Sequence, residues 1–277
     1  MATNICFGTA GIPKSSSKKD SVFAIKVVKD CSLDAMELEF VRGVRLKKEK
    51  AEKIFIEKEK HNIMLSCHAP YYINLNSKEP EKITASIKRI VDSAIALNFA
   101  GGKNVVFHCG FYQDISKDVA LENVIIGMKE IRKQLDELNL NHMFLRPELT
   151  GKASQIGDEF ELVKICKQVS NTLPCIDFSH YFARYLGEKE FDELFVFLNE
   201  NLPEFFEDIH CHLSGIEFTQ KGEKKHLNFQ ECEINYKKVI ELLIKYKCNG
   251  TVICESPSIE EDAKILKDYY LNCLKKI

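Results

Sequence analysis

Short apolar segments alternate with longer amphipathic segments along the whole chain. Each short segment is typical of a buried strand, and the segment after it carries apolar residues at helical spacing, as Val239, Leu242, Leu243 and Tyr246 do in NYKKVIELLIKYK. We predict strands at Ile5–Ala10, Met36–Val41, Ile63–Ala69, Asn104–Gly110, His142–Leu149, Pro174–Ser179, Asp208–Leu213 and Thr251–Glu255. A helix is expected after each of them.

This alternation predicts a parallel sheet, because each helical crossover returns the chain to the same edge of the sheet. At 277 residues, the predicted fold class is α/β, a closed (β/α)8 TIM barrel that forms a single domain over residues 1–277. The alternative is an open doubly wound sheet, but its dinucleotide-binding form lacks support because no G-x-G-x-x-G follows the first strand. No Gly/Ser-rich or Pro-rich linker divides the chain.

The charge and the cysteine content indicate how the protein could bind a partner and in which cellular compartment it is expected. With 39 basic and 41 acidic residues, the chain would hold a nucleic acid through a local basic patch rather than through an overall positive charge. Eleven scattered cysteines, without paired C-x-x-C spacing or a secretory signal, indicate reduced thiols and a cytoplasmic protein. No apolar run approaches the ~20 residues of a membrane helix, so no membrane partner is expected.

Six predicted strands end in a histidine or a carboxylate, and His180 follows one of them closely. The six residues are His68, His108, Glu148, Asp177, His212 and Glu255. In a barrel these strand ends meet at one mouth, where the active sites of such folds lie. Buried carboxylates there would cost on the order of several kcal/mol each unless bound cations compensated their charge. The mixture of imidazole and carboxylate donors suits Zn²⁺, with Mn²⁺ or Fe²⁺ as alternatives, and predicts metal-dependent hydrolysis.

Four cysteines stand beside these residues but are expected to point away from them. Side chains alternate between the two faces of a strand, so a neighbour of an inward-facing ligand faces the helices. We therefore predict small, buried, apolar roles for Cys67, Cys109, Cys211 and Cys254.

Two further charged segments allow alternatives. Glu37 and Glu39 share one face of the second strand, where they could accept hydrogen bonds from metal ligands or serve as simple hydrogen-bonded interior carboxylates. The segment Lys47–Lys60 looks basic but is interleaved with Glu, which favours a salt-bridged helix surface over a DNA-binding stripe.

An ordered set of motifs at these strand ends carries a family resemblance over most of the chain. The motifs are FGTAGIP, CHAPYYINL, VVFHCGFY, PELTGK, CIDFSHYFAR, HCHLSG, GEKKHL and CESP. In these motifs the chain resembles the endonuclease IV family of apurinic/apyrimidinic endonucleases, in particular its shorter archaeal-type branch. The resemblance implies a TIM barrel with three zinc ions that hydrolyses the phosphodiester 5′ to an abasic site in double-stranded DNA, in base excision repair.

The resemblance also implies three zinc sites, with Glu148 as the catalytic residue that orients the attacking hydroxide. The first site would use His68, His108 and Glu148, the second Glu148, Asp177, His212 and Glu255, and the third His180 and His226. The family has an Asp two residues before the last of these histidines, where this chain has Lys224. Glu223 could substitute with its longer reach. Otherwise the third site is expected to be weaker, two-liganded, or filled only with substrate phosphate.

The resemblance further implies contacts at the DNA lesion. Tyr71 matches a tyrosine that acts where the abasic nucleotide leaves the stack, although a tyrosine packed on the rim is the alternative. Either Arg42 or Arg45, in the loop after the second strand, would insert at the lesion. Three lysines beside the third site could contact phosphates or be solvated surface charges: Lys221, Lys224 and Lys225.

Two other classes of function remain open at this point. Related barrels isomerise or epimerise sugars with one or two metal ions, although the number of histidines here argues against that class. A non-catalytic protein that binds damaged DNA is the second alternative, motivated by the missing Asp. A monomer is expected by resemblance.

Overall fold

The computed structural model describes residues 3–276. Its central strands are β1 (Asn4–Ala10), β2 (Ala35–Glu39), β3 (Met64–His68), β4 (Asn104–Phe107), β6 (Phe144–Pro147), β8 (Cys175–Asp177), β9 (Ile209–Leu213) and β12 (Asn249–Cys254). They form one parallel sheet in the order β6-β4-β3-β2-β1-β12-β9-β8. Each predicted strand overlaps one of them.

The two ends of this sheet meet, so the sheet closes into a barrel. Strands β6 and β8 are joined by isolated parallel bridges, Leu145 with Thr172 and Glu148 with Cys175, rather than by a continuous ladder. A single (β/α)8 TIM barrel results, as the alternation along the chain predicts, and the open doubly wound sheet is excluded.

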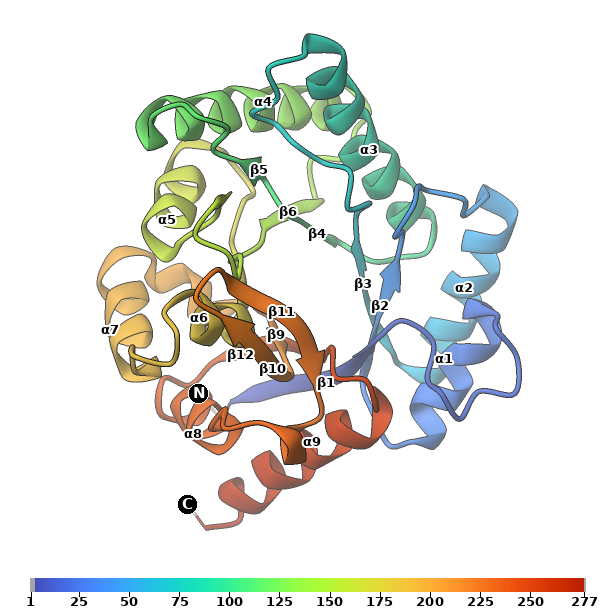
Figure 1. Cartoon of the computed structure of the whole chain (residues 1–277). Coiled ribbons are helices and arrows are strands. Elements are labelled where there is room, and N and C mark those ends of the chain that lie inside the picture. The colour runs from blue at the N-terminus through green and yellow to red at the C-terminus, as the bar shows by residue number, and fades with distance from the viewer. Residues whose placement is uncertain (1–2, 277) are drawn as a thin grey trace.

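Helices surround the barrel in sequence order (Figure 1). They are α1 (Ser21–Asp30), α2 (Lys48–His61), α3 (Pro80–Phe99), α4 (Lys117–Glu137), α5 (Glu159–Gln168), α6 (Phe178–Arg184), α7 (Phe191–Asn201), α8 (Tyr236–Lys245) and α9 (Glu260–Leu274). Two short 3₁₀ segments, Pro203–Glu207 and Phe229–Glu231, complete the helical elements. The described part of the chain has no helix long and apolar enough to cross a membrane.

Two small antiparallel pairs lie outside the barrel. Strand β5 (Gly110–Phe111) pairs with β7 (Gln155–Ile156), and β10 (Gly215–Thr219) forms a hairpin with β11 (Gly222–Leu227). In Figure 1 this hairpin lies in front of the barrel strands.

Two sequence-based assignments of secondary structure, both near predicted metal ligands, were wrong. The strand predicted at Pro174–Ser179 ends at Asp177, because the Asp177 carboxylate accepts the backbone N–H groups of Ser179 (2.6 Å) and His180 (2.8 Å) and starts helix α6. His226, which falls in none of the predicted strands, lies in strand β11. Both differences place a predicted metal ligand on a more rigid element than a loop.

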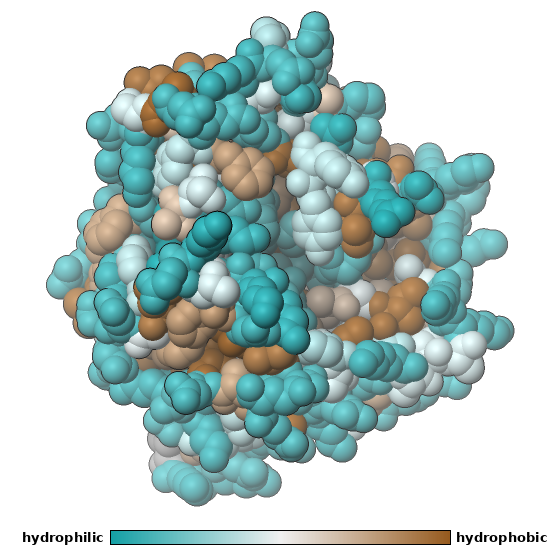
Figure 2. All heavy atoms as spheres, in the orientation of Figure 1, coloured by the Kyte–Doolittle hydropathy of each residue, from teal (hydrophilic) through white to brown (hydrophobic). Residues whose placement is uncertain are grey.

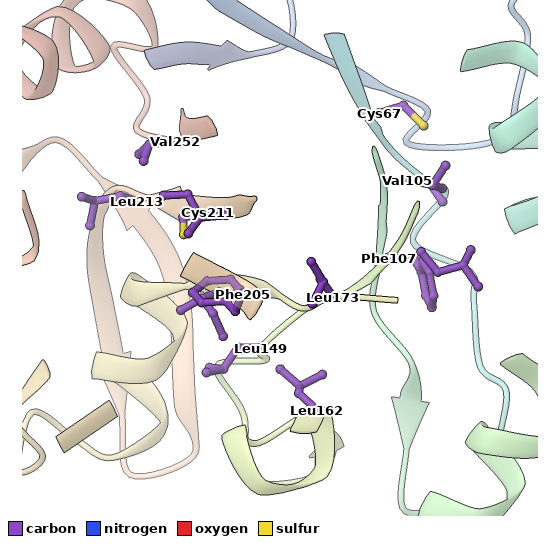
Figure 3. Close-up of a cluster of buried hydrophobic side chains, with 14 of the residues drawn as sticks. Cys67, Val105, Phe107, Leu149, Leu162, Leu173, Phe205, Cys211, Leu213 and Val252 are labelled. Atoms are coloured by element: carbon purple, nitrogen blue, oxygen red, sulfur yellow. The ribbon is translucent and has the colours of Figure 1, made fainter. Parts of the chain in front are cut away.

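The hydrophobic core lies between the strands and the helices. Figure 3 shows Cys67 and Cys211 among buried aliphatic and aromatic side chains of this layer. Cys109 and Cys254 belong to the same core, so the apolar role predicted for all four cysteines is confirmed. All eleven cysteines of the chain lie within the described residues and are free thiols.

The basic-looking segment after β2 forms the outer surface of α2. Its charges pair along the helix, as Lys48 does with Glu52 (3.9 Å) and Lys60 with Glu57 (3.5 Å). The prediction of a salt-bridged helix surface at Lys47–Lys60 is therefore confirmed.

Candidate metal centre

All the sequence-predicted metal ligands converge at the carboxyl ends of the strands. His68 and Asp177 are the last residues of β3 and β8, and Glu255 follows β12 directly. Figure 2, in the orientation of Figure 1, shows this face hollowed near its middle. The donor atoms form three groups, each within 4.8 Å: His68, His108 and Glu148; Glu148, Asp177, His212 and Glu255; and His180, Glu223 and His226.

The Glu148 carboxylate joins the first two groups. Its Oε2 lies 3.0 Å from His68 Nε2 and 3.1 Å from His108 Nε2, whereas its Oε1 lies 3.4 Å from His212 Nδ1. Donors around a tetrahedral zinc ion with bonds of about 2.0–2.1 Å are separated by about 3.3–3.4 Å. The two oxygens of Glu148 are thus spaced to serve one ion on each side.

Hydrogen bonds fix the orientation of three of the histidines. His68 donates its Nδ1–H to the backbone carbonyl of the next residue (2.7 Å), and His180 donates to that of Leu149 (2.9 Å). His226 Nδ1 lies 2.6 Å from Ser214 Oγ. These contacts hold Nδ1 of each ring and turn Nε2 toward the carboxylates of the donor groups, where it could bind a metal ion.

The third group contains Glu223 rather than the residue at the family's Asp position. Glu223 Oε2 lies 3.4 Å from His180 Nε2, and His226 completes the group from the same β11 strand. Lys224 instead pairs with Glu217 at the surface of the hairpin. The group therefore has three donors, so the structure gives no reason to expect a two-liganded site.

The electrostatics of the centre call for bound cations. Burial raises the pKa of Glu148, but His108 and His212 outweigh this effect and hold it well below its usual range. Burial lowers the pKa of His68, but Glu148 outweighs it and raises that pKa to about 9. Among the described residues, no lysine or arginine pairs with these buried carboxylates, and Asp177 Oδ2 has no hydrogen-bond partner. The buried donors fit a divalent metal centre.

A further buried group lies deeper in the barrel and was missed by sequence reasoning. Cys175, His210 and His212 bring their donor atoms within 4.8 Å, and His210 Nε2 lies 2.8 Å from Glu37 Oε2. His210 stands two residues before His212 on β9, so strand alternation could have placed both on the inner face. Burial raises the pKa of the Cys175 thiol, which is therefore protonated in the metal-free protein.

The residues predicted to contact DNA surround the mouth. Tyr71 is 58% exposed, and its ring centroid lies 5.5 Å from that of His68. Arg42 and Arg45 are exposed and line a pocket of 420 Å³ that also contacts Glu39. These positions suit the predicted roles, which remain predictions.

Two lysines of the β10–β11 hairpin form ion pairs with the same carboxylate. Lys224 and Lys225 both pair with Glu217, the latter at 3.3 Å, and Lys221 stands at the hairpin turn. Phosphate contact by these lysines also remains a prediction.

A model of the xylose isomerase-like TIM barrel family matches residues 25–271. The chain belongs to this family. It is 44% identical over 271 residues to the uncharacterized protein MJ0133 of Methanocaldococcus jannaschii, covering 96% of this chain and 97% of that protein. It is also 32% identical over 129 residues to a probable endonuclease 4 of Mesomycoplasma hyopneumoniae strain 7448, covering 46% of this chain but only 45% of that protein.

Solved structures of other proteins have a similar fold. A D-tagatose 3-epimerase-like protein superposes with a TM-score of 0.75 at 18% identity, covering 97% of this chain and 99% of that one. Endonuclease IV of Thermus thermophilus superposes with a TM-score of 0.72 at 17% identity, covering 97% of this chain and 100% of that one. At these identities the likeness extends to the fold alone, and the reaction has to be argued from the site.

Proposed function

We propose that this protein is a zinc-dependent apurinic/apyrimidinic endonuclease that hydrolyses the phosphodiester 5′ to abasic sites in double-stranded DNA, in base excision repair. The observation that carries the proposal is the set of three adjoining donor groups, two of them joined by Glu148. Phosphodiester hydrolysis develops charge on several oxygens at once, and a set of adjoining cations matches that distribution. When bound, such ions supply Lewis-acid polarisation of the phosphate and neutralise its charge.

The residues of the chain have separable tasks in this reaction. Glu148, ionised and fully buried, is suited to orient the attacking water between the first two groups. The group of His180, Glu223 and His226 stands to one side, where it would hold the region of the leaving 3′-oxygen. Tyr71, exposed at the rim, offers a ring on which the exposed bases at the lesion can stack.

The donor chemistry supports zinc as the metal. Imidazole nitrogens and carboxylate oxygens are the common ligands of Zn²⁺, with Mn²⁺ and Fe²⁺ as alternatives, whereas Mg²⁺ prefers oxygen alone. The partial sequence match to probable endonuclease 4 proteins supports the same reaction class. We further propose that the protein acts as a monomer, which size-exclusion chromatography with light scattering can check.

The decisive test is an incision assay. Zinc-loaded protein is incubated with duplex DNA that carries one tetrahydrofuran abasic analogue, beside the same duplex without the lesion. We expect a single cut 5′ to the lesion, which disappears when the metal is chelated and returns when zinc is added. No cut by protein that contains three zinc ions per chain would exclude the proposal.

A sugar isomerase or epimerase is the second candidate function, and one observation favours it. A pocket of 520 Å³ lies beside the mouth, and Ile12, Met36, Leu38 and Glu39 are among its lining residues. Its size and mixed lining suit a small sugar, and such a reaction needs only one metal ion. One Mn²⁺ per chain, no DNA binding and turnover of ketohexoses would favour this candidate.

A non-catalytic binder of damaged DNA is the third candidate function, and the structure gives it less support than the sequence does. That alternative rested on the missing third-site Asp, and Glu223 now supplies a carboxylate to the group. Lesion-selective binding without incision in the same assay would restore it.

A further inference from the structure

The His212 ring is turned the opposite way from the rings of His68, His180 and His226. Its Nδ1 lies 3.4 Å from Glu148 Oε1 and 3.4 Å from Glu255 Oε1, inside the second donor group. Its Nε2 lies 2.8 Å from Glu37 Oε1, on the side away from that group. The other rings present Nε2 to the centre and hold Nδ1 against a carbonyl or hydroxyl oxygen. His180 Nδ1 also lies 3.2 Å from Glu148 Oε1 and from Asp177 Oδ2, but both carboxylates belong to the donor groups, whereas Glu37 behind His212 belongs to none of them.

Glu37 is held firmly through its second oxygen. Its Oε2 accepts a hydrogen bond from Ser66 Oγ (2.6 Å) and another from His210 Nε2 (2.8 Å). Glu37 and Ser66 are register partners on β2 and β3, while His210 reaches them from β9. All three side chains are at most 3% exposed. Two donors on one oxygen fix the carboxylate and leave Oε1 directed at His212.

The contact between Glu37 and His212 is close but incomplete in this structure. Glu37 Oε1 and His212 Nε2 are 2.8 Å apart, yet they are not aligned as a hydrogen bond, and neither has another partner among the described residues. Buried polar atoms of this kind are costly unless they are paired. A small rotation of the imidazole about its own stem would complete the bond and leave Nδ1 free for a metal ion.

We propose that Glu37, held by Ser66 and His210, is a positioning residue that fixes His212 as an Nδ1 ligand of a divalent cation in the second donor group. A carboxylate that accepts the Nε2–H selects the tautomer, orients the ring and makes the ligating nitrogen more basic. This inference rests on the metal centre of the proposed function but does not depend on which reaction it catalyses. Removing such an outer partner typically costs about 10- to 100-fold in metal affinity.

A fourth metal site at Cys175, His210 and His212 is the competing explanation of the same cluster. It would require the Cys175 thiol to ionise and the His212 ring to leave Glu37. In that case the cysteine, rather than the carboxylate, would determine an extra bound ion. Substituting each of the two separately tells the explanations apart.

The test measures zinc affinity and stoichiometry without DNA. Full-length Glu37→Gln, Glu37→Ala and Cys175→Ser are titrated with zinc against a chromophoric chelator, and bound ions are counted by mass spectrometry. We expect Glu37→Ala to weaken one of the three ions by about 10- to 100-fold. Glu37→Gln, whose amide oxygen can still accept a hydrogen bond, should recover part of that loss. Cys175→Ser should bind like the natural chain.

A spectroscopic signature separates positioning from a merely structural role. In zinc-loaded protein, nuclear magnetic resonance should show a strongly deshielded imidazole N–H from His212 Nε2, and Glu37→Ala should abolish it. Ser66→Ala removes one donor from Glu37 with little change in volume, so it serves if the Glu37 variants fail to fold. It should weaken the same ion by a smaller factor than Glu37→Ala does, because the carboxylate itself remains.

Specific results would overturn the inference. Wild-type zinc affinity in folded Glu37→Ala, or in Ser66→Ala if the former does not fold, excludes a positioning role. Loss of an ion in Cys175→Ser would replace it with the fourth metal site. If zinc binds as expected but abasic DNA is not cut, the proposed function fails and this inference stands.

Discussion

Replacing Gly151 with alanine should empty the third donor group while leaving the other two intact. The β10–β11 hairpin rests on this glycine, and the Glu223 backbone N–H donates to its carbonyl at 3.0 Å. A Cβ on Gly151 would lie 2.6 Å from Glu223 Cβ and 3.1 Å from His180 Cδ2. The added methyl group would therefore push Glu223 and His180 apart, the two residues that would bind one metal ion in the third donor group.

The required movement is large on the scale of a metal bond. Carbon atoms pack at about 3.5–4.0 Å, so the hairpin must retreat by about 1 Å. Glu223 Oε2 and His180 Nε2 are now 3.4 Å apart, close to the separation of about 3.3–3.4 Å in a tetrahedral zinc site. A shift of about 1 Å would carry one donor out of bonding range. We expect at least the ~100-fold loss of affinity that removing a ligand's outer partner can cause.

The assay counts zinc after dialysis against a weak chelator and compares incision rates. The natural chain should keep three ions, and Gly151→Ala two, with incision slowed on the order of 100-fold, as for a 1 Å misplacement of a reacting group. Gly127→Ala in α4 is the matched control, because the three atoms nearest to its Cβ all belong to the Leu75 side chain, the closest at 3.3 Å, and none belongs to the metal centre. Three tightly held ions in Gly151→Ala would refute this reasoning.

Three further predictions test other parts of the site. Glu148→Gln should abolish incision but retain lesion-selective binding in a gel-shift assay, and it should lower the zinc count because two donor groups share this carboxylate. Burial raises the pKa of Glu39 to about 8. In metal-free protein the free energy of unfolding therefore falls as the pH rises from the pKa of this carboxyl in the unfolded chain towards 8, because the folded protein must then bury an ionised carboxylate. Glu39→Gln should therefore raise the unfolding midpoint by several degrees at pH 9 and little at pH 5, as followed by circular dichroism; equal shifts at both values would contradict the assignment. Tyr71→Ala should weaken binding to the abasic duplex by about tenfold, the scale of one lost base–aromatic stacking contact, whereas Tyr71→Phe should not. An equal loss on undamaged duplex would instead indicate a general role.

The sequence predicted the barrel and most of the centre because both depend on local patterns. Strand alternation separates His68 from Cys67, and barrel closure brings strand ends together whatever their separation along the chain. The same alternation would have identified His210 from His212. These inferences need only periodicity and the length of the chain.

What the sequence left open depends on contacts between distant segments. Whether Glu223 or Lys224 faces His180 is decided by the register of the β10–β11 hairpin, which shifts between Glu217 and Phe218. Spacing alone cannot predict such an irregularity. The partnership of Glu37 with His210 joins residues 173 positions apart, and no local pattern encodes it.

The junction between β6 and β8 gives the metal centre a second consequence. This junction has isolated bridges in place of a ladder, and the second donor group takes Glu148 from one side of it and Asp177 from the other. An ion bound by both would act as a clasp across the seam of the barrel. Metal removal should therefore loosen one side of the molecule first, with amide hydrogen exchange rising at Leu149 and Leu173 before it rises at the β1–β12 ladder opposite. The metal centre would then stabilise the closed barrel as well as take part in the reaction.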